Sequence, residues 1–285
     1  MAATAPALAG VDHRVFTRLE EFQELGRREH QRWPEQVQRS LRRLALAGVH
    51  DPLTDQPVPP QQLEVVDANC RETLGVEGVV SRQRAQLLVL RWLVQNGELP
   101  PLEQQRLYLS EAITGYAEYL RQRCPQLRTS EYLPDPNHRL RGRVANRDIR
   151  QLSLPPASMH CLICNEVFEH VEQLPQALAS LVEVLTLDGY LLATVPLAYG
   201  QQASIVKAIW RGEDQEPELL MEPEWHGDPV HPQQGSLVYQ IPGWELLDQL
   251  REAGFRWAEL HAISSERYGV LGAELPYVFV VVAKR

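Results

Sequence analysis

A polar segment of six residues, Asn165 to His170, follows a short apolar run in the middle of the chain. The segment offers an amide, two carboxylates and one imidazole, and imidazole has the pKa best suited to proton transfer near neutral pH. Glu166 lies four positions before His170, and Glu169 lies one position before it. If the segment turns as a helix, Glu166 and His170 share a face, so the carboxylate can orient and tune the imidazole. The alternative is that this pair caps the next helix and shapes the wall of a site.

A second polar segment, Glu222 to His231, has the sequence EPEWHGDPVH. Its two prolines restrict the backbone, and His226 with Asp228 offers a base and an orienting carboxylate. We expect His226 to be the residue that activates an acceptor, with His170 second. The alternative is a structural loop that closes over a site by its own hydrogen bonds.

The elements around the first segment predict a βαβ unit. Residues 161–164 form an apolar run of strand length, apolar residues recur at helical spacing over 174–185, and an Asp188-Gly189 turn precedes a second apolar run at 190–195. Ligands bind at the carboxyl ends of the strands in an open parallel sheet. The segment from Asn165 to His170 therefore lies where a binding site is expected.

Strands and helices alternate on both sides of this unit. The expected strands are 107–110, 127–132, 144–146, 257–262 and 277–282, and the expected helices are 116–123 and 243–253. Such alternation predicts an α/β fold with a parallel sheet covered by helices on both faces. Residues 197–240 interrupt it with a predicted short helix at 204–210, and an insertion of this length is typical of a lid or a substrate-recognition element.

The first hundred residues follow another pattern. Apolar stripes predict helices within 12–50, residues 51–62 are rich in proline, and a strong helix is expected from Ser81 to Gln95. We expect residues 1–100 to form a helical extension that caps the site, and residues 101–285 to form the main domain. Exposed leucines on the same helices would also allow a homodimer.

Composition limits the classes of function. A chain of 285 residues with 44% hydrophobic and 23% charged residues can bury a sizeable core. The net charge of −9 argues against a nucleic-acid partner. Cys161 and Cys164 have C-x-x-C spacing, but residues three apart on a strand point to opposite faces, so no metal site is predicted. We expect no signal peptide and no membrane partner, and therefore a soluble cytoplasmic protein.

The run Asn165 to Val171, NEVFEHV, resembles the class I S-adenosylmethionine-dependent methyltransferases of the methyltransferase type 11 kind. The Glu222 to His231 segment is similar to a Pro-Glu-Tyr-His-Gly-Asp/Asn-Pro segment of one subfamily, with Trp225 in place of tyrosine. The resemblance implies a Rossmann-like seven-stranded sheet whose last strand is antiparallel. It also implies S-adenosylmethionine as the cofactor, no metal, and methyl transfer to a small-molecule acceptor, oxygen more than nitrogen.

The same resemblance implies a cofactor site at the ends of the first strands. A turn of small residues would approach the methionine part, Glu131 would bind the ribose hydroxyls, and Asp148 would bind the adenine amino group, with Ile149 packed on the ring. The residues assigned to the cofactor in this way are Ser110, Glu111, Ala112, Gly115, Glu131, Asp148, Ile149, Asn165 and Glu166.

The turn after the first strand departs from the family pattern. Tyr108 stands where an acidic residue is typical, and Ser110, Ala112 and Thr114 stand where glycines are typical. Two functions stay open: a methyltransferase, or a non-catalytic relative that acts as a binding or scaffold module. The second function predicts that Tyr108, Ile113 or Thr114 fills the volume of the methionine part.

Overall fold

The computed structural model describes residues 8–65, 69–212 and 215–285. The remaining positions of the predicted N-terminal extension and of the insertion lie outside the described residues. The chain divides into two compact units. Unit 1 comprises residues 1–102 and 259–281, and unit 2 comprises residues 103–258 and 282–285.

Seven strands form one sheet in the order β1-β17-β18-β10-β9-β7-β8. Their bounds are β1 Asp12–Phe16, β7 Leu107–Leu109, β8 Leu127–Thr129, β9 Met159–Asn165, β10 Leu185–Thr194, β17 Trp257–Ser264 and β18 Val278–Lys284. β8, β7, β9 and β10 pair in parallel, whereas β1 is antiparallel to β17. This mixed sheet with its helices confirms the predicted Rossmann-like class I methyltransferase fold, and the N-terminal helices are present.

Two strands of the sheet differ from the prediction. Residues 144–146, expected as a strand, make one isolated bridge between Glu131 and Asn146. The Asn146 side chain accepts a bond from Leu133 N (2.7 Å), so a side chain replaces part of the ladder. The seventh strand is instead β1, in a region predicted to be helical. β1 is a strand because its five residues pair with residues of β17, which lie about 250 positions later in the sequence. The sequence pattern of five residues does not reveal such a distant partner.

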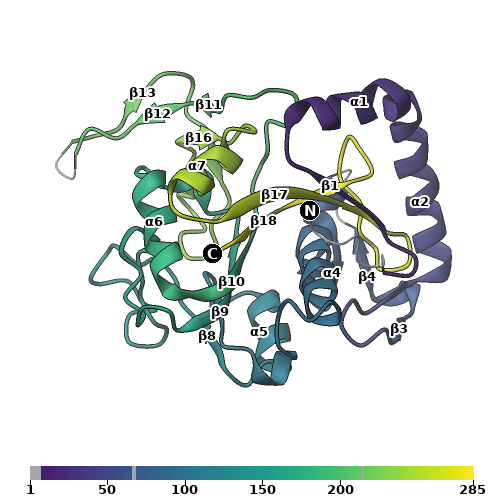
Figure 1. Cartoon of the computed structure of the whole chain (residues 1–285), viewed down its shortest axis with the longest axis horizontal. Helices are drawn as coiled ribbons and strands as arrows, with labels where there is room; N and C mark the ends of the chain where they lie inside the picture. Colours follow the sequence, from purple (N-terminus) through teal and green to yellow (C-terminus); the bar gives the residue numbers. More distant parts are fainter. Residues whose placement is uncertain (1–7, 66–68, 213–214) are drawn as a thin grey trace. The chain divides into compact units, whose positions relative to one another are not determined.

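Unit 2 builds its helices from the predicted apolar stripes. These helices are α5 Gly115–Arg121, α6 Leu174–Val184 and α7 Leu246–Glu252, and Figure 1 shows α6 and α7 side by side. α6 buries Leu174, Leu178 and Leu181, and residues 161–164 of β9 are buried throughout. The Thr114 side chain caps α5 by accepting a bond from Ala117 N. The βαβ unit predicted around residues 161–195 is confirmed.

The insertion consists of short strand pairs. They are β11 Ile205–Val206 with β16 Gln240–Ile241, β12 Ala208–Ile209 with β13 Glu218–Leu219, and β14 Trp225–His226 with β15 Ser236–Leu237 (Figure 1). The helix predicted at 204–210 is wrong, because Ile205, Val206 and Ile209 are β-branched and favour extended backbone.

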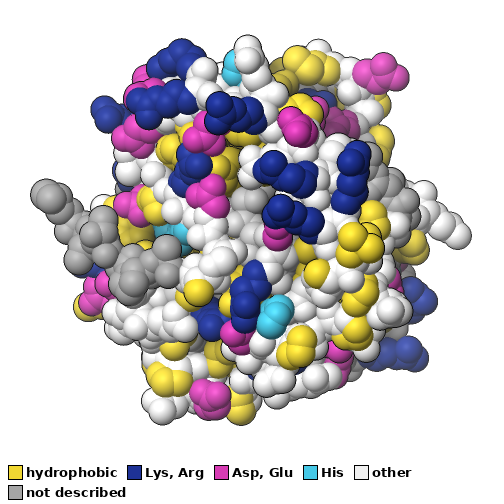
Figure 2. All heavy atoms as spheres, turned by 90° about the vertical axis from the view of Figure 1, so that its right-hand side faces the viewer, with side chains coloured by type: hydrophobic (Ala, Val, Ile, Leu, Met, Phe, Trp, Pro, Cys, Tyr) yellow, Lys and Arg dark blue, Asp and Glu magenta, His cyan; other side chains and the backbone are white. Residues whose placement is uncertain are grey.

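Unit 1 is largely helical. Its helices are α1 Leu19–Glu29, α2 Trp33–Ala47, α3 Cys70–Thr73 and α4 Ser81–Gln95, and its short strands are β2 Val49–His50, β3 Pro57–Val58, β4 Leu63–Val65, β5 Leu74–Val76 and β6 Val79–Val80. The helix predicted from Ser81 to Gln95 is confirmed at both ends. α1 and α2 bury apolar stripes and expose charged residues, and Figure 2 shows basic side chains interspersed with acidic ones on this side of the molecule. In the parts of the chain that the structure describes, no helix is both long and apolar enough for a membrane span.

Arg84 lies at the centre of unit 1 and is only 2% exposed. Its guanidinium donates to the carbonyl oxygens of Leu74 (2.9 Å) and Tyr268 (2.9 Å), and also to those of Val79 and Gly269. A cation in low dielectric is tolerated when its donors are satisfied in this way. Arg84 therefore joins two parts of unit 1 that lie far apart in the sequence.

Candidate functional site

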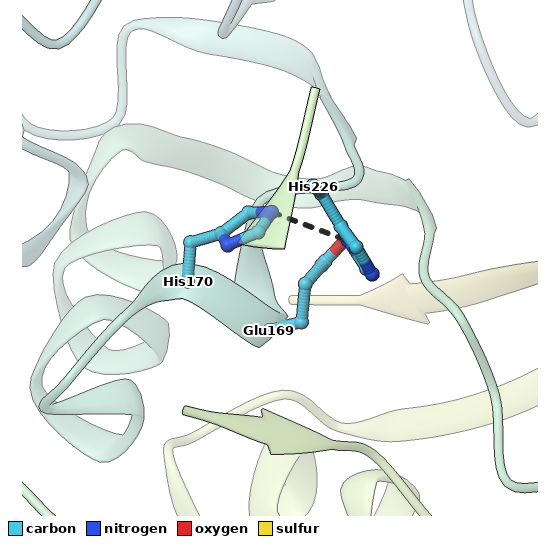
Figure 3. A group of neighbouring side chains, drawn as sticks. All are labelled: Glu169, His170 and His226. Carbon is cyan, nitrogen blue, oxygen red and sulfur yellow. Dashed lines mark ion pairs between the residues drawn. The ribbon is translucent and has the colours of Figure 1, made fainter. Parts of the chain in front are cut away.

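Three side chains of unit 2, Glu169, His170 and His226, meet just after the end of β9 (Figure 3). Glu169 and His170 belong to the 3-10 helix Phe168–His170, and His226 lies on β14 of the insertion. Glu169 Oε1 is 3.7 Å from His170 Nε2 and 3.7 Å from His226 Nδ1. The two imidazole rings are nearly perpendicular, with centroids 5.2 Å apart. The structure thus brings together the two histidines that the sequence singled out, and we call these three residues the trio.

One backbone–backbone bond and one bond from a side chain hold the insertion against the 3-10 helix. Tyr239 N donates to the carbonyl oxygen of Glu169 (2.8 Å), and His170 Nδ1 is 2.7 Å from the carbonyl oxygen of Leu237. These contacts tie the strands of the insertion to the residues that follow β9. The insertion therefore contributes His226 to the trio and contacts both of its other residues, and its role in substrate recognition stays a prediction.

Glu224 orients His226. Its Oε1 is 3.0 Å from His226 Nε2, and the two residues are two positions apart on extended backbone, so their side chains point to the same side. The predicted pairing of His226 with Asp228 is wrong, because Asp228 accepts bonds from Val230 N, His231 and Ser236. The sequence analysis did not single out Glu224, although its spacing from His226 was a usable signal.

Glu169 is fully buried, at 0% exposure. Neither carboxylate oxygen has a hydrogen-bond partner within residues 8–65, 69–212 and 215–285. Burial raises the pKa of Glu169 to about 7, the neighbouring Glu169 raises that of His226 to about 8, and burial lowers the pKa of His170. The predicted partner of His170, Glu166, lies before the 3-10 helix with φ 48°, so it does not share a helical face with His170. Glu169 takes that place.

Asn165 and Glu111 lie at the ends of neighbouring strands. Asn165 ends β9, and its Nδ2 donates to Glu111 Oε1 (2.6 Å), while its Oδ1 accepts a bond from Thr194 (3.2 Å). In the sheet, β7 lies between β8 and β9, so successive strands are added on opposite sides of β7. The strand order therefore reverses between β7 and β9, and open α/β sheets bind ligands at the carboxyl ends of the strands at such a point. The structure therefore places both residues at the edge expected for a cofactor.

The turn after β7 is held by Glu131. Its Oε1 accepts bonds from Ala112 N (2.6 Å) and Ile113 N (3.1 Å), and burial raises its pKa. The Ser110 hydroxyl is buried and has no hydrogen-bond partner among the described residues. The small side chains of this turn and the hydroxyl of Ser110 fit a polar ligand such as S-adenosylmethionine.

The side chains that a non-catalytic relative would place in the methionine volume have other positions. Tyr108 is fully buried, and its hydroxyl bonds Ser130 Oγ (2.7 Å). Thr114 caps α5, and Ile113 is 38% exposed. Tyr108 and Thr114 therefore have structural partners of their own.

Asp148 is engaged by a cation of the chain. It caps the 3-10 helix Ile149–Gln151 by accepting from Arg150 N (2.8 Å), and its carboxylate pairs with the Arg150 guanidinium at 2.6 Å. Arg150 also pairs with Glu172 at 2.9 Å, and Ile149 is buried. Arg150 bonds both carboxylate oxygens of Asp148. An adenine amino group could therefore bond only to lone pairs of Asp148 that Arg150 does not use.

Comparisons with known proteins bear on the same region. Residues 115–193 match the family model described as methyltransferase domain. No curated protein matches the chain.

Several solved structures are similar to the chain. One is an S-adenosylmethionine-dependent methyltransferase from Mesorhizobium loti (13% identity, 68% of this chain and 97% of that one, TM-score 0.40). Another is the Burkholderia thailandensis 1,6-didemethyltoxoflavin-N1-methyltransferase with bound 1,6-didemethyltoxoflavin and S-adenosylhomocysteine (15%, 73% and 79%, TM-score 0.39). A third is a methyltransferase from Aquifex aeolicus (14%, 67% and 87%, TM-score 0.35). The domain match covers α5, β8, β9, α6 and most of β10 of unit 2.

Proposed function

We propose that the protein transfers a methyl group from S-adenosylmethionine to a hydroxyl oxygen of a small molecule. One observation carries this proposal. The segment from Asn165 to His170 supplies Asn165 at the switch point of the sheet and Glu169 and His170 of the trio. A single six-residue stretch thus serves the donor end and the acceptor end of the reaction.

On the donor side, S-adenosylmethionine supplies an electrophilic methyl group on a sulfonium. The residues proposed to hold it are Ser110, Glu111, Ala112, Gly115, Glu131, Asp148, Ile149, Asn165 and Glu166. Glu131 fixes the turn through Ala112 N and Ile113 N, so the turn is in place before a ligand binds. The orphaned hydroxyl of Ser110 can gain a partner from the ligand.

On the acceptor side, we propose that His226 and His170, with Glu169, activate the acceptor. A hydroxyl oxygen has to lose its proton to become a strong nucleophile, which makes a basic group useful for an oxygen acceptor. The side chains of His226 and His170 are 30% and 18% exposed, so an acceptor from solvent can reach them. The net charge of −9 favours a small-molecule acceptor over a nucleic acid.

Calorimetric titration with S-adenosylhomocysteine tests the proposal. We expect one equivalent to bind, and Asn165→Ala to weaken binding. We expect His226→Gln to keep the affinity for S-adenosylhomocysteine within about twofold, yet to lower methyl transfer to a panel of phenols and hydroxy acids about 100-fold or more. If millimolar S-adenosylhomocysteine does not bind, the enzyme is excluded and the non-catalytic binding module is favoured.

A further inference from the structure

We propose that Glu169, His170 and His226 bind a divalent transition-metal ion such as Zn²⁺. The ligand atoms would be a carboxylate oxygen of Glu169, His170 Nε2 and His226 Nδ1, which all lie within 4.8 Å of one another. Metal binding by itself does not depend on the proposed function. The role of the metal in methyl transfer rests on that function.

The hydrogen bonds of the two imidazoles fix where their protons lie. His170 Nδ1 is 2.7 Å from the Leu237 carbonyl, and His226 Nε2 is 3.0 Å from the Glu224 carboxylate. Carbonyl and carboxylate oxygens only accept, so these two ring nitrogens carry the protons. A metal ion would bind the remaining nitrogen of each ring, His170 Nε2 and His226 Nδ1, and at His226 it would displace the proton that faces Glu169.

Both of these nitrogens lie next to the Glu169 carboxylate. Glu169 Oε1 is 3.7 Å from each of the two nitrogens, and the Glu169 carboxylate is fully buried, with no hydrogen-bond donor for either oxygen among the described residues. A buried carboxylate is unfavourable unless a cation lies beside it, and that cation can be a proton on His226 Nδ1 or a metal ion bound by all three residues. Two ligands of one tetrahedral Zn²⁺ ion lie about 3.3–3.5 Å apart, so a small inward movement closes the site.

Contacts outside the trio match those of metal-binding histidines. Such histidines usually give their second ring N–H to a carboxylate or a backbone carbonyl, as His226 does with Glu224 and His170 with Leu237. Lys207 forms an ion pair with Glu224 and holds it in place. This outer arrangement orients both imidazoles toward the same point beside Glu169.

The ligand types select the metal. Two imidazole nitrogens and one carboxylate oxygen suit Zn²⁺ and similar transition metals, whereas Mg²⁺ and Ca²⁺ prefer sets of oxygen ligands. Three protein ligands leave a position for a further oxygen, which is typical of catalytic zinc sites. The ligands lie on two segments well separated in the sequence, which is why cysteine spacing alone led to a prediction of no metal.

With a metal bound, His170 and His226 are ligands and no longer act as bases, so the metal would activate the acceptor in their place. A hydroxyl oxygen bound to a divalent cation has a lowered pKa, and its proton leaves to solvent water at neutral pH. The oxygen then forms a bond to the methyl carbon while the carbon–sulfur bond breaks and sulfur keeps the electron pair. The metal keeps its charge throughout, so no oxidant or reductant is required.

The test is metal titration of the full chain after chelation and dialysis. We expect one Zn²⁺ per chain by calorimetry and one Co²⁺ by visible absorption. Glu169→Gln, His170→Gln and His226→Gln should each weaken Zn²⁺ binding by at least about 100-fold, and Glu224→Gln by about 10-fold. His231→Gln is the matched control, because His231 lies in the same insertion but bonds Asp228, and it should bind Zn²⁺ as the wild type does.

Three results would overturn the proposal. They are no uptake of Zn²⁺ or Co²⁺ by the chelated wild type, wild-type affinity in all three ligand variants, or an equal loss in His231→Gln. If Glu169→Gln does not fold, His226→Gln decides, with circular dichroism as the check on folding. Titration of the wild type and the folded variants with S-adenosylhomocysteine separates the two proposals. Metal uptake without S-adenosylhomocysteine binding contradicts the methyltransferase, and the reverse contradicts the metal site.

Discussion

Two fully buried charges, Arg84 in unit 1 and Glu169 in unit 2, have opposite surroundings. The guanidinium of Arg84 donates to four backbone carbonyls, two of them at 2.9 Å. The carboxylate of Glu169 faces two imidazole nitrogens at 3.7 Å and has no donor in the described parts of the chain. The chain satisfies the first charge with hydrogen bonds, and it gives the second only two imidazole nitrogens at 3.7 Å.

This difference separates a structural charge from a functional one. Burying a charge is expensive in free energy, and the chain recovers that loss only when it supplies partners of the opposite kind. Arg84 has such partners, so its role is to hold unit 1 together. Glu169 has no hydrogen bond to either oxygen among the described residues and only two imidazoles beside it, which is why we infer that a metal ion joins the three side chains.

The largest expected effect is on Arg84. Arg84→Met keeps the bulk but removes every donor to the four buried carbonyls, so the free energy of unfolding should fall by about 3–5 kcal/mol. Denaturant unfolding measures this change, with Arg42→Met on the exposed face of α2 as the control, expected within about 0.5 kcal/mol of the wild type. An unfolding free energy of Arg84→Met equal to the wild type would show that Arg84 is not structural.

The second prediction concerns the missing partner of Glu169. Zn²⁺ at 100 times its dissociation constant should raise the free energy of unfolding of the wild type by about 2.7 kcal/mol and leave that of Glu169→Gln unchanged. Without metal, Glu169→Gln should be more stable than the wild type by about 1 kcal/mol, because its side-chain amide can donate to the imidazole nitrogens. Denaturant unfolding with and without chelator gives both values. An equal Zn²⁺ stabilisation of the wild type and of Glu169→Gln would show that Glu169 does not bind the metal.

A third prediction uses two buried histidines of unit 1. His13 Nε2 is 2.9 Å from His261 Nδ1. Burial, together with His261, lowers the pKa of His13 to about 3, and burial lowers that of His261. The unfolded chain binds protons below about pH 6.5 that the folded chain does not, so stability should fall with acidification, by about 1 kcal/mol per pH unit from His13 and further from His261.

Unfolding titrations between pH 7 and pH 5 check this dependence. His13→Gln should make the free energy of unfolding fall less steeply with acidification, because glutamine does not titrate. A stability that stays constant between pH 7 and pH 5 would mean that these histidines are charged or solvated in the folded protein.

The smallest effect is expected at Ser110, whose buried hydroxyl is also without a partner among the described residues. Ser110→Ala should change the stability by less than about 0.5 kcal/mol and weaken S-adenosylhomocysteine binding by up to about tenfold. Ser180 is the matched control, since its hydroxyl accepts a bond from Leu152 N (2.8 Å). Ser180→Ala should lose stability and keep the affinity. The opposite pattern would show that the donor site lies elsewhere.

Periodicity predicted the parts of the fold that are built from local patterns. The helix Ser81–Gln95 and the βαβ unit around β9 were predicted because apolar spacing over ten or more residues determines which face is buried. β1 could not be predicted, since an edge strand depends on a partner distant in the sequence. The helix predicted at 204–210 failed because its β-branched residues pair with residues outside that window.

The sequence predicted which residues form the candidate site better than it predicted which residues they bond. His170 and His226 were chosen for their chemistry, and they are adjacent in the structure. Their orienting carboxylates were misassigned to Glu166 and Asp228, because local dihedral angles decide that Glu169 and Glu224 point at the rings. A buried carboxylate without a donor is a property of the folded chain, and no sequence pattern reveals it.

The four carbonyls around Arg84 also impose an order on synthesis. Leu74 and Val79 leave the ribosome with Arg84, but Tyr268 and Gly269 follow some 184 and 185 residues later. Unit 2 is almost continuous in the sequence and can fold as it is made, since domains fold as units during translation. Unit 1 cannot complete its fold until residues 268 and 269 are made, because Arg84 has only two of its four carbonyl partners before then. The nascent chain should therefore stay susceptible to proteases and chaperones in its N-terminal part until residue 269 emerges.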